Sequence, residues 1–161
     1  MLFRSLVLTW FLFPVVLSAT IGLFLESVAE AVEARHYPTL PKATRLPIWP
    51  LLLASLRFLL VACLLNVLLL PCLLLGPLFP IVYYVVNGYL LGRSYFELVA
   101  WRRLDPASAR ILRRQHAGTV ILAGIATALL LTVPLLNLIA PVLAVMAMVH
   151  LVQDWRRAGS T

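Results

Sequence analysis

The chain has 161 residues and a net charge of +7, with 63% hydrophobic and 12% charged residues. The charged share is about half of that in soluble domains, so the composition argues against a soluble fold and favours one membrane domain over residues 1–161. The excess of Lys and Arg is weak support for a nucleic-acid partner, because membrane proteins collect these residues in cytoplasmic loops, and we expect no such partner.

The first predicted element is a helix that spans the membrane over residues 5–25. This stretch has no charged residue and is rich in Leu, Val, Ile and Phe, which insert favourably into a bilayer. A cleaved signal peptide is the alternative, because Arg4 precedes the stretch and Leu17, Ser18 and Ala19 resemble a cleavage site. The stretch is longer than the roughly 7–15 apolar residues of a signal peptide, which favours the spanning helix.

The same helix is expected to continue beyond the membrane with an acidic face. Glu26, Glu30 and Glu33 recur at helical spacing. Three carboxylates in a row could relay protons or hold a cation. The simpler interpretation is a face that is solvated or paired with arginines where the helix leaves the lipid. Pro38 ends the helix, and the proline-rich residues 38–50 form an extended connector.

Residues 58–92 form a second uncharged stretch, interrupted by prolines and by Gly76. Its limbs, residues 58–70 and 81–92, would be about 20 Å and 18 Å long as helices, less than the ~30 Å hydrocarbon core of a bilayer. The sequence therefore predicts a helical hairpin that enters the bilayer from one side, with two short spans as the alternative. The helix that carries the first limb is predicted over residues 51–70 and includes Arg57, which is costly in lipid. Either this helix enters lipid only at about Phe58, or the Arg57 side chain reaches back to the surface.

The returning limb carries two local signals. Gly88 and Gly92 have the GxxxG spacing that lets another helix approach closely. Arg93 and Glu97 are spaced for an ion pair on one helical face. The sequence therefore predicts a helix–helix contact and an ion pair on this limb.

Asp105 and Pro106 begin a new helix, since Asp is a good N-cap and Pro is favoured in the first turn. Arg110, Arg113 and Arg114 follow beside apolar residues. A basic amphipathic helix of this kind could bind anionic lipid headgroups, so these three arginines are the predicted lipid contacts. As part of a positively charged cytoplasmic loop they would need no such partner, which is the simpler interpretation.

Residues 115–153 are the longest uncharged stretch. As one helix it would be roughly 58 Å long, far more than the ~30 Å core, so the chain must fold back. Pro134, Asn137 and Pro141 place the reversal at its middle, because prolines remove backbone donors and Asn favours turns. The sequence thus predicts a second hairpin. Its limbs are residues 117–133 and 138–153.

Positive charge gathers in residues 34–57, in residues 92–114 and in the C-terminal tail. If all of them face the cytoplasm, two hairpins supply the even number of passages that must separate them, and the N-terminus lies outside. Trp49, Trp101 and Trp155 lie near these boundaries, as interfacial tryptophans do. The predicted fold class is all-α: an integral membrane protein with one long spanning helix and two proline-broken helical hairpins, re-entrant or short-span.

The sequence contains no catalytic motif, so we expect no enzyme, no metal site and no cofactor. His36, His116 and His150 lie in different segments without ligand spacing. Cys63 and Cys72 lie in apolar sequence, where cysteine behaves as a small hydrophobic residue. The remaining chemistry is in polar side chains within the apolar stretches: Asn66, Tyr83, Tyr84, Asn87, Thr127, Thr132 and Asn137.

Polar groups in lipid are costly unless they are bonded, so these side chains either hold helices together or line a polar path. Helices that begin near Pro80 and Pro141 would point their positive ends into the membrane. That arrangement favours an anion.

Three segments of the chain resemble one known family. They are residues 87–104 (NGYLLGRSYFELVAWRRL), 133–150 (VPLLNLIAPVLAVMAMVH) and 24–35 (FLESVAEAVEAR). Together they are similar to the CysZ-type sulfate permeases, which are grouped with the eukaryotic etoposide-induced membrane proteins. The resemblance implies an all-helical protein of the bacterial inner membrane, with two long membrane helices and two helix pairs that penetrate partway. It also implies a homo-oligomer that admits sulfate for cysteine synthesis.

Members of that family begin with a further membrane helix and a basic loop implicated in sulfate contact, whereas this chain starts at what would be their second helix. We therefore expect a domain that is shortened at its N-terminus, and no sulfate-contacting residue is transferred from the family.

The leading hypothesis is a multi-pass permease or channel-like protein for sulfate or a related oxyanion. Asn87, Arg93 and Asn137 are the predicted substrate-binding residues. The alternative is a non-transporting membrane scaffold whose basic helix binds anionic lipid or a partner protein. A membrane enzyme would need a reacting cluster of His, Asp or Glu, which the sequence does not offer.

Overall fold

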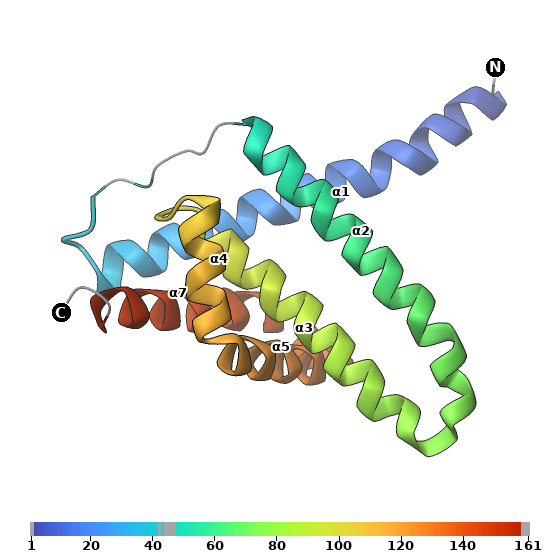
Figure 1. Cartoon of the computed structure of the whole chain (residues 1–161). Coiled ribbons are helices and arrows are strands. Elements are labelled where there is room, and N and C mark those ends of the chain that lie inside the picture. The colour runs from blue at the N-terminus through green and yellow to red at the C-terminus, as the bar shows by residue number, and fades with distance from the viewer. Residues whose placement is uncertain (1, 42, 44–47, 159–161) are drawn as a thin grey trace.

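The computed structural model describes residues 2–41, 43 and 48–158, and these residues form helices and no strand. The all-α prediction is therefore confirmed. Figure 1 shows the helices in chain order: α1 (Leu2–His36), α2 (Ile48–Cys72), the short 3-10 helix η1 (Leu73–Leu78), α3 (Phe79–Ala100), α4 (Pro106–Gln115), α5 (Ala117–Thr132), α6 (Pro134–Asn137) and α7 (Ala140–Ala158).

α1 is one continuous helix that extends well beyond the predicted span, as the sequence indicated. It ends at His36, shortly before Pro38, because a residue that precedes a proline is disfavoured in the helical conformation. The acidic face of α1 is divided. Glu26 and Glu30 are exposed, whereas Glu33 is only 3% exposed and faces the rest of the protein.

α2 and α3 form the first predicted hairpin, and the chain reverses between them at Gly76 (Figure 1). Gly76 has φ = 57°, a left-handed conformation that glycine adopts without strain. The limbs are longer than predicted, because α2 has 25 residues and α3 has 22. Arg57 and Arg93 lie inside these helices and do not bound them, since Arg is a good helix former.

The helices thus contain the predicted limbs and extend past them, and the length argument for a re-entrant hairpin does not apply to α2. At about 37 Å, α2 is long enough for a ~30 Å bilayer core. Among the residues whose side chains the structure describes, which leave out most of residues 1–19, Leu52–Cys72 is the one single helical segment both long and apolar enough to cross a membrane, with a mean hydropathy of 2.4. α4 and α5 reach that length only together, and they are bent by 87° where they meet.

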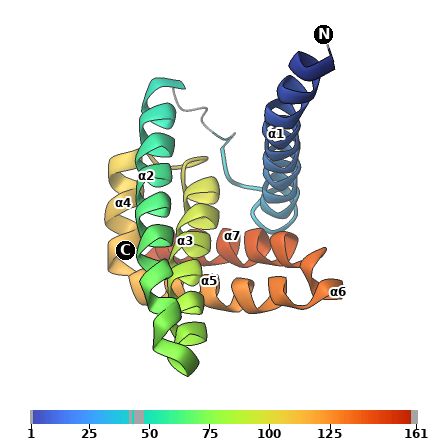
Figure 2. The ribbon, with the colours of Figure 1, turned by 90° about the vertical axis from the view of Figure 1, so that its right-hand side faces the viewer.

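α5 and α7 form the second predicted hairpin and lie side by side, joined by α6 (Figure 2). The break falls at the predicted prolines. Val133 is extended, with φ = −91° and ψ = 119°, and Pro134 begins α6. In the view of Figure 2, the α5–α7 hairpin runs across the α2–α3 hairpin, with α3 next to α5.

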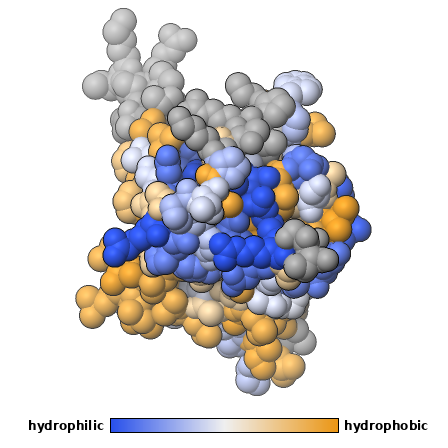
Figure 3. Space-filling model, turned by 90° about the vertical axis from the view of Figure 1, so that its left-hand side faces the viewer, coloured by the Kyte–Doolittle hydropathy of each residue, from blue (hydrophilic) through white to orange (hydrophobic). Residues whose placement is uncertain are grey.

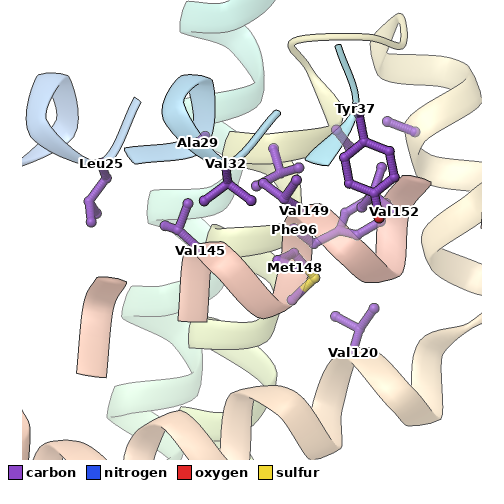
Figure 4. Close-up of a cluster of buried hydrophobic side chains, with 13 residues drawn as sticks. Leu25, Ala29, Val32, Tyr37, Phe96, Val120, Val145, Met148, Val149 and Val152 are labelled. Atoms are coloured by element: carbon purple, nitrogen blue, oxygen red, sulfur yellow. The ribbon is translucent and has the colours of Figure 1, made fainter. Parts of the chain in front are cut away.

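A cluster of buried hydrophobic side chains lies where the second half of α1, the end of α3 and α7 meet (Figure 4). Phe96 of α3 is fully buried, and Met148 and Val149 of α7 belong to the same cluster. From α1, Ala29 and Val32 complete the contact. This core fixes α1 and α7 against α3.

α2 contributes little to that packing, since only 6% of its apolar segment is buried. Leu53, Leu60 and Leu64 are all more than 60% exposed. A contiguous apolar surface of this size is rare on soluble proteins and marks contact with lipid or with another protein.

The end of α1, the start of α5 and the end of α7 meet at one end of the molecule. Tyr37 Oη lies 2.9 Å from His150 Nδ1, which joins the end of α1 to α7. The His116 ring, at the junction of α4 and α5, stacks on Trp155 with ring centroids 4.1 Å apart. Hydrophilic residues form a band on this side of the molecule, with hydrophobic residues below it (Figure 3). The structure thus brings the end of α1, the junction of α4 and α5, and the end of α7 together, while the shared membrane side of the basic segments stays a prediction.

Candidate functional site

α3 crosses α5 through glycines, and this contact positions the polar residues of both helices. A Cβ atom at Gly124 would lie 1.8 Å from the Gly88 carbonyl oxygen and 2.6 Å from the Gly92 nitrogen. A Cβ atom at Gly92 would lie 2.2 Å from the Val120 carbonyl oxygen. Only glycine allows backbones to approach this closely, which confirms the predicted contact. Its partner Gly124 was not identified from the sequence, because it has no GxxxG spacing of its own.

Arg93 follows this crossing on α3 and is only 8% exposed. Its Nε donates a hydrogen bond of 2.7 Å to Glu97 Oε1, which confirms the predicted ion pair. Its guanidinium carbon also lies 5.1 Å from the centre of the Phe58 ring on α2, a cation–π distance. Arg93 therefore contacts α2 through Phe58, and its positive charge is paired with the Glu97 carboxylate.

A second arginine, Arg113 of α4, approaches the same place. The side chains of Arg93 and Arg113 both lie close enough to Tyr89 to interact with its hydroxyl group. With Glu97 bonded to Arg93, two positive charges meet one negative charge here. A surplus of positive charge with several N–H donors is the chemistry that binds an oxyanion such as sulfate. We call Tyr89, Arg93, Glu97 and Arg113 the basic cluster.

Another group of charges surrounds Glu33. Its carboxylate accepts hydrogen bonds from Arg103 at 2.7 Å and from Arg102 at 3.2 Å, and Arg103 also donates to the Pro41 carbonyl. The three charged side chains are no more than 13% exposed. For Glu33 this confirms the interpretation of a face paired with arginines. The sequence did not indicate which arginines, because the partners follow about 70 residues later.

Asn87 lies in a groove of about 440 Å³ between α3 and α5. In this groove Tyr84 Oη of α3 lies 3.1 Å from Thr132 Oγ1 of α5, a hydrogen bond across helices of the predicted kind. Most of the other polar side chains bond back to their own helix. Asn66, Asn87, Thr127 and Thr132 each donate to the carbonyl four residues earlier.

The structure does not bring the three predicted substrate-binding residues into one site. Asn87 lies in the groove, Arg93 lies nearly two turns later in the basic cluster, and Asn137 is exposed at the end of α6. Their role in substrate binding stays a prediction. In the part of the chain that the structure describes, no group of three or more His, Cys, Asp or Glu side chains could hold a metal ion.

α4 begins as predicted. The Asp105 carboxylate accepts hydrogen bonds from the backbone N–H groups of Ala107 at 3.0 Å and Ser108 at 3.1 Å. The hydrogen bonds from Ser108 hold the pKa of Asp105 below its usual value. Of the predicted lipid contacts, Arg110 and Arg114 are exposed, whereas Arg113 is partly buried in the basic cluster. That second contact of Arg113 was not indicated by the sequence.

These features define an all-helical protein with a broad exposed apolar surface and arginines held between its helices. The model of the family described as sulfate transporter CysZ/etoposide-induced protein 2.4 matches residues 1–141, so the chain belongs to that family. This confirms the resemblance noted in the sequence. Searches of the curated proteins and of the solved structures return no match.

Proposed function

We propose that this protein is a multi-pass membrane permease or channel-like protein for sulfate or a related oxyanion. In this proposal it lies in the bacterial inner membrane and supplies sulfur for cysteine synthesis. Its family, which includes sulfate transporters, supports the substrate class. The long apolar surface of α2 supports a membrane environment, because lipid tails would cover it without cost.

The observation that supports the substrate contact best is the convergence of Arg93 and Arg113 on Tyr89. Guanidinium groups bind tetrahedral oxyanions through several directed N–H bonds. Glu97 competes for Arg93, so an incoming oxyanion exchanges one anionic partner for another and no bare charge is buried. Asn87 and Asn137 are proposed as further polar groups along the same path.

Uptake of radiolabelled sulfate into proteoliposomes that contain the purified protein tests this function. We expect saturable uptake well above that of empty vesicles. Arg93→Gln should lower uptake at least about tenfold, because a hydrogen bond to a charged group contributes roughly 1.5–3 kcal/mol. Arg57→Gln is the matched control, since Arg57 lies in an apolar helix but is exposed, and uptake should be unchanged.

Uptake equal to that of empty vesicles would remove the permease proposal. Equal losses of uptake in Arg93→Gln and Arg57→Gln would remove the proposed role of the basic cluster. Both variants lose one positive charge, but only Arg93 belongs to that cluster, whereas Arg57 is exposed on α2.

The orientation of α4 favours a second candidate, a membrane scaffold that binds anionic lipid. α4 stands at 87° to the apolar helix α5, so it would lie flat on the membrane if α5 entered it. Arg110 and Arg114 are exposed for contact with headgroups. Their joint replacement by Gln should weaken cosedimentation with phosphatidylglycerol vesicles, whereas Arg35→Gln, an exposed arginine of α1, should not. Unaltered cosedimentation of the double variant would count against the scaffold.

We also propose that the protein assembles as a homo-oligomer, because a second copy could cover part of the apolar surface of α2. Light scattering after size-exclusion chromatography in detergent measures the protein mass. A mass of one chain at all concentrations would contradict the assembly.

A further inference from the structure

The groove between α3 and α5 has its own chemistry, separate from that of the basic cluster. Its lining includes Tyr83, Tyr84, Asn87 and Thr132 and is completed by apolar residues, and none of its lining residues is charged. Tyr83 is 43% exposed, so the groove opens to the surroundings of the protein. Its ligand preference therefore depends on which hydrogen-bond donors and acceptors remain free.

The lining side chains have five donor hydrogens, on the hydroxyl groups of Tyr83, Tyr84 and Thr132 and on the Asn87 amide, and three of them are already used. The Thr132 hydroxyl has a single hydrogen, which it donates to the Ala128 carbonyl at 3.0 Å. In the 3.1 Å contact between Tyr84 and Thr132, Tyr84 must therefore be the donor. The Asn87 amide nitrogen donates one hydrogen to the Tyr83 carbonyl at 2.9 Å. Two hydroxyl hydrogens and one amide hydrogen are thus directed at the protein itself, and the Tyr83 hydroxyl and the second Asn87 amide hydrogen are the donors that remain.

The free groups are mainly acceptors. Asn87 Oδ1 has no partner among the described residues, and the lone pairs of Tyr84 Oη and one lone pair of Thr132 Oγ1 remain. Aromatic rings stand beside these oxygens: Tyr83 lies edge-on to Tyr84, with ring centroids 5.6 Å apart. Neutral acceptor oxygens, such as amide and hydroxyl oxygens, attract a cation and repel an oxyanion. With no carboxylate in the lining, a monovalent ion fits better than a divalent one.

We propose that this groove is a binding site for a monovalent metal cation. The role of the bound cation rests on the proposed permease function. The binding of the cation by the groove does not. An oxyanion that enters a compartment of negative potential works against that potential, and a cation bound one to two helical turns from the basic cluster offsets part of the charge. Asn87 then serves the proposed path through the bound cation and not through a direct bond to the anion, which Arg93 contacts.

Scintillation proximity binding with the purified protein and radiolabelled sodium or rubidium tests the site without any transport. We expect saturable binding of one of these ions, displaced by the unlabelled chloride salt and not by choline chloride. Asn87→Leu should weaken the affinity for the cation at least about tenfold, because it removes Asn87 Oδ1, the acceptor that has no partner among the described residues. Tyr84→Phe, which keeps the ring and removes one oxygen, should weaken it less.

Asn66→Leu is the matched control. Asn66 makes the same type of bond to its own helix, at 2.8 Å to the Ala62 carbonyl, but it lies on α2 and not in the groove. It should leave cation binding unchanged. Circular dichroism of each variant checks that the helices are retained. If Asn87→Leu does not fold, the Tyr84→Phe result decides.

Three results would overturn the cation site: no saturable binding of either ion, equal losses in the Asn87 and Asn66 variants, or loss of radiolabelled sulfate binding in Asn87→Leu with cation binding intact. Saturable cation binding by a protein that moves no sulfate would refute the permease function and leave the site standing. The two proposals therefore fail separately.

Discussion

α2 and α3 are neighbours of similar length, yet they have opposite environments. Only 6% of the apolar segment of α2 is buried, whereas α3 contains the fully buried Phe96 and crosses α5 through glycines. Their arginines differ in the same way. Arg57 of α2 is exposed, and Arg93 of α3 is buried and paired with Glu97.

The two helices thus show two kinds of apolar sequence: one that faces the surroundings of the protein and one that packs against other helices. The outer surface of α2 needs only an apolar environment, so most of its residues could be exchanged for others of similar hydropathy. α3 needs particular residues, because its neighbours are other helices with fixed shapes. Function is therefore expected to depend on α3 and the helices that it contacts. α2 is expected to serve mainly as a membrane-spanning helix.

The largest expected effect is at Phe96. Phe96→Ala should lower the stability of the protein in detergent by about 3–5 kcal/mol, because it leaves a cavity in the core between α1, α3 and α7. Leu60→Ala on α2 is the control, since Leu60 is 64% exposed, and its stability should barely change. Thermal unfolding followed by circular dichroism measures both. Similar losses at the two positions would show that α2 packs inside the protein after all.

The glycine crossing gives the next effect. Gly124→Ala should destabilise by about 1–3 kcal/mol, because its Cβ atom would overlap backbone atoms of Gly88 and Gly92 that cannot move aside cheaply. Gly118→Ala lies in the same helix with open space around its Cβ, and it should stabilise by about 0.5–1 kcal/mol through helix propensity. The same unfolding measurement compares them. Two equal changes would contradict the close crossing.

The smallest effect concerns pH. Hydrogen bonds lower the pKa of Asp105 in the folded protein, so its contribution to α4 is present above the unfolded pKa and is lost as pH falls through the folded pKa. We expect hydrogen exchange of the first turn of α4 to become faster than the core as the solution is acidified. Asp105→Asn keeps a capping side chain but cannot titrate, so this dependence should vanish. A variant with the same pH dependence as the native protein would contradict the cap.

Local signals were sufficient for much of this fold. The end of α1 before Pro38, the start of α4 at Asp105 and the break at Pro134 all follow from the backbone chemistry of a few adjacent residues. The pair of Arg93 and Glu97 was equally accessible, because both lie on one face of one helix.

What the sequence missed depends on contacts between distant segments. Nothing near Glu33 indicates that Arg102 and Arg103 will surround it, and the spacing around Gly124 does not mark it as the partner of Gly88. The predicted limbs were shorter than the helices because Arg57 and Arg93 were taken as the limits of the uncharged, lipid-embedded stretch. The bonds of Thr and Asn side chains to their own helices also left fewer bonds between helices than expected.

The central claim is that the basic segments lie on one side of a membrane whose lipid covers α2. Single cysteines at Ala107 in α4, Asp154 in α7 and Leu60 in α2 test it, with Cys63 and Cys72 replaced by Ala, in vesicles of one orientation treated with a membrane-impermeant maleimide. The account predicts that the first two cysteines react from the same side and that the Leu60 position reacts from neither. Reaction of Ala107 and Asp154 positions from opposite sides, or ready reaction at the Leu60 position, would contradict it.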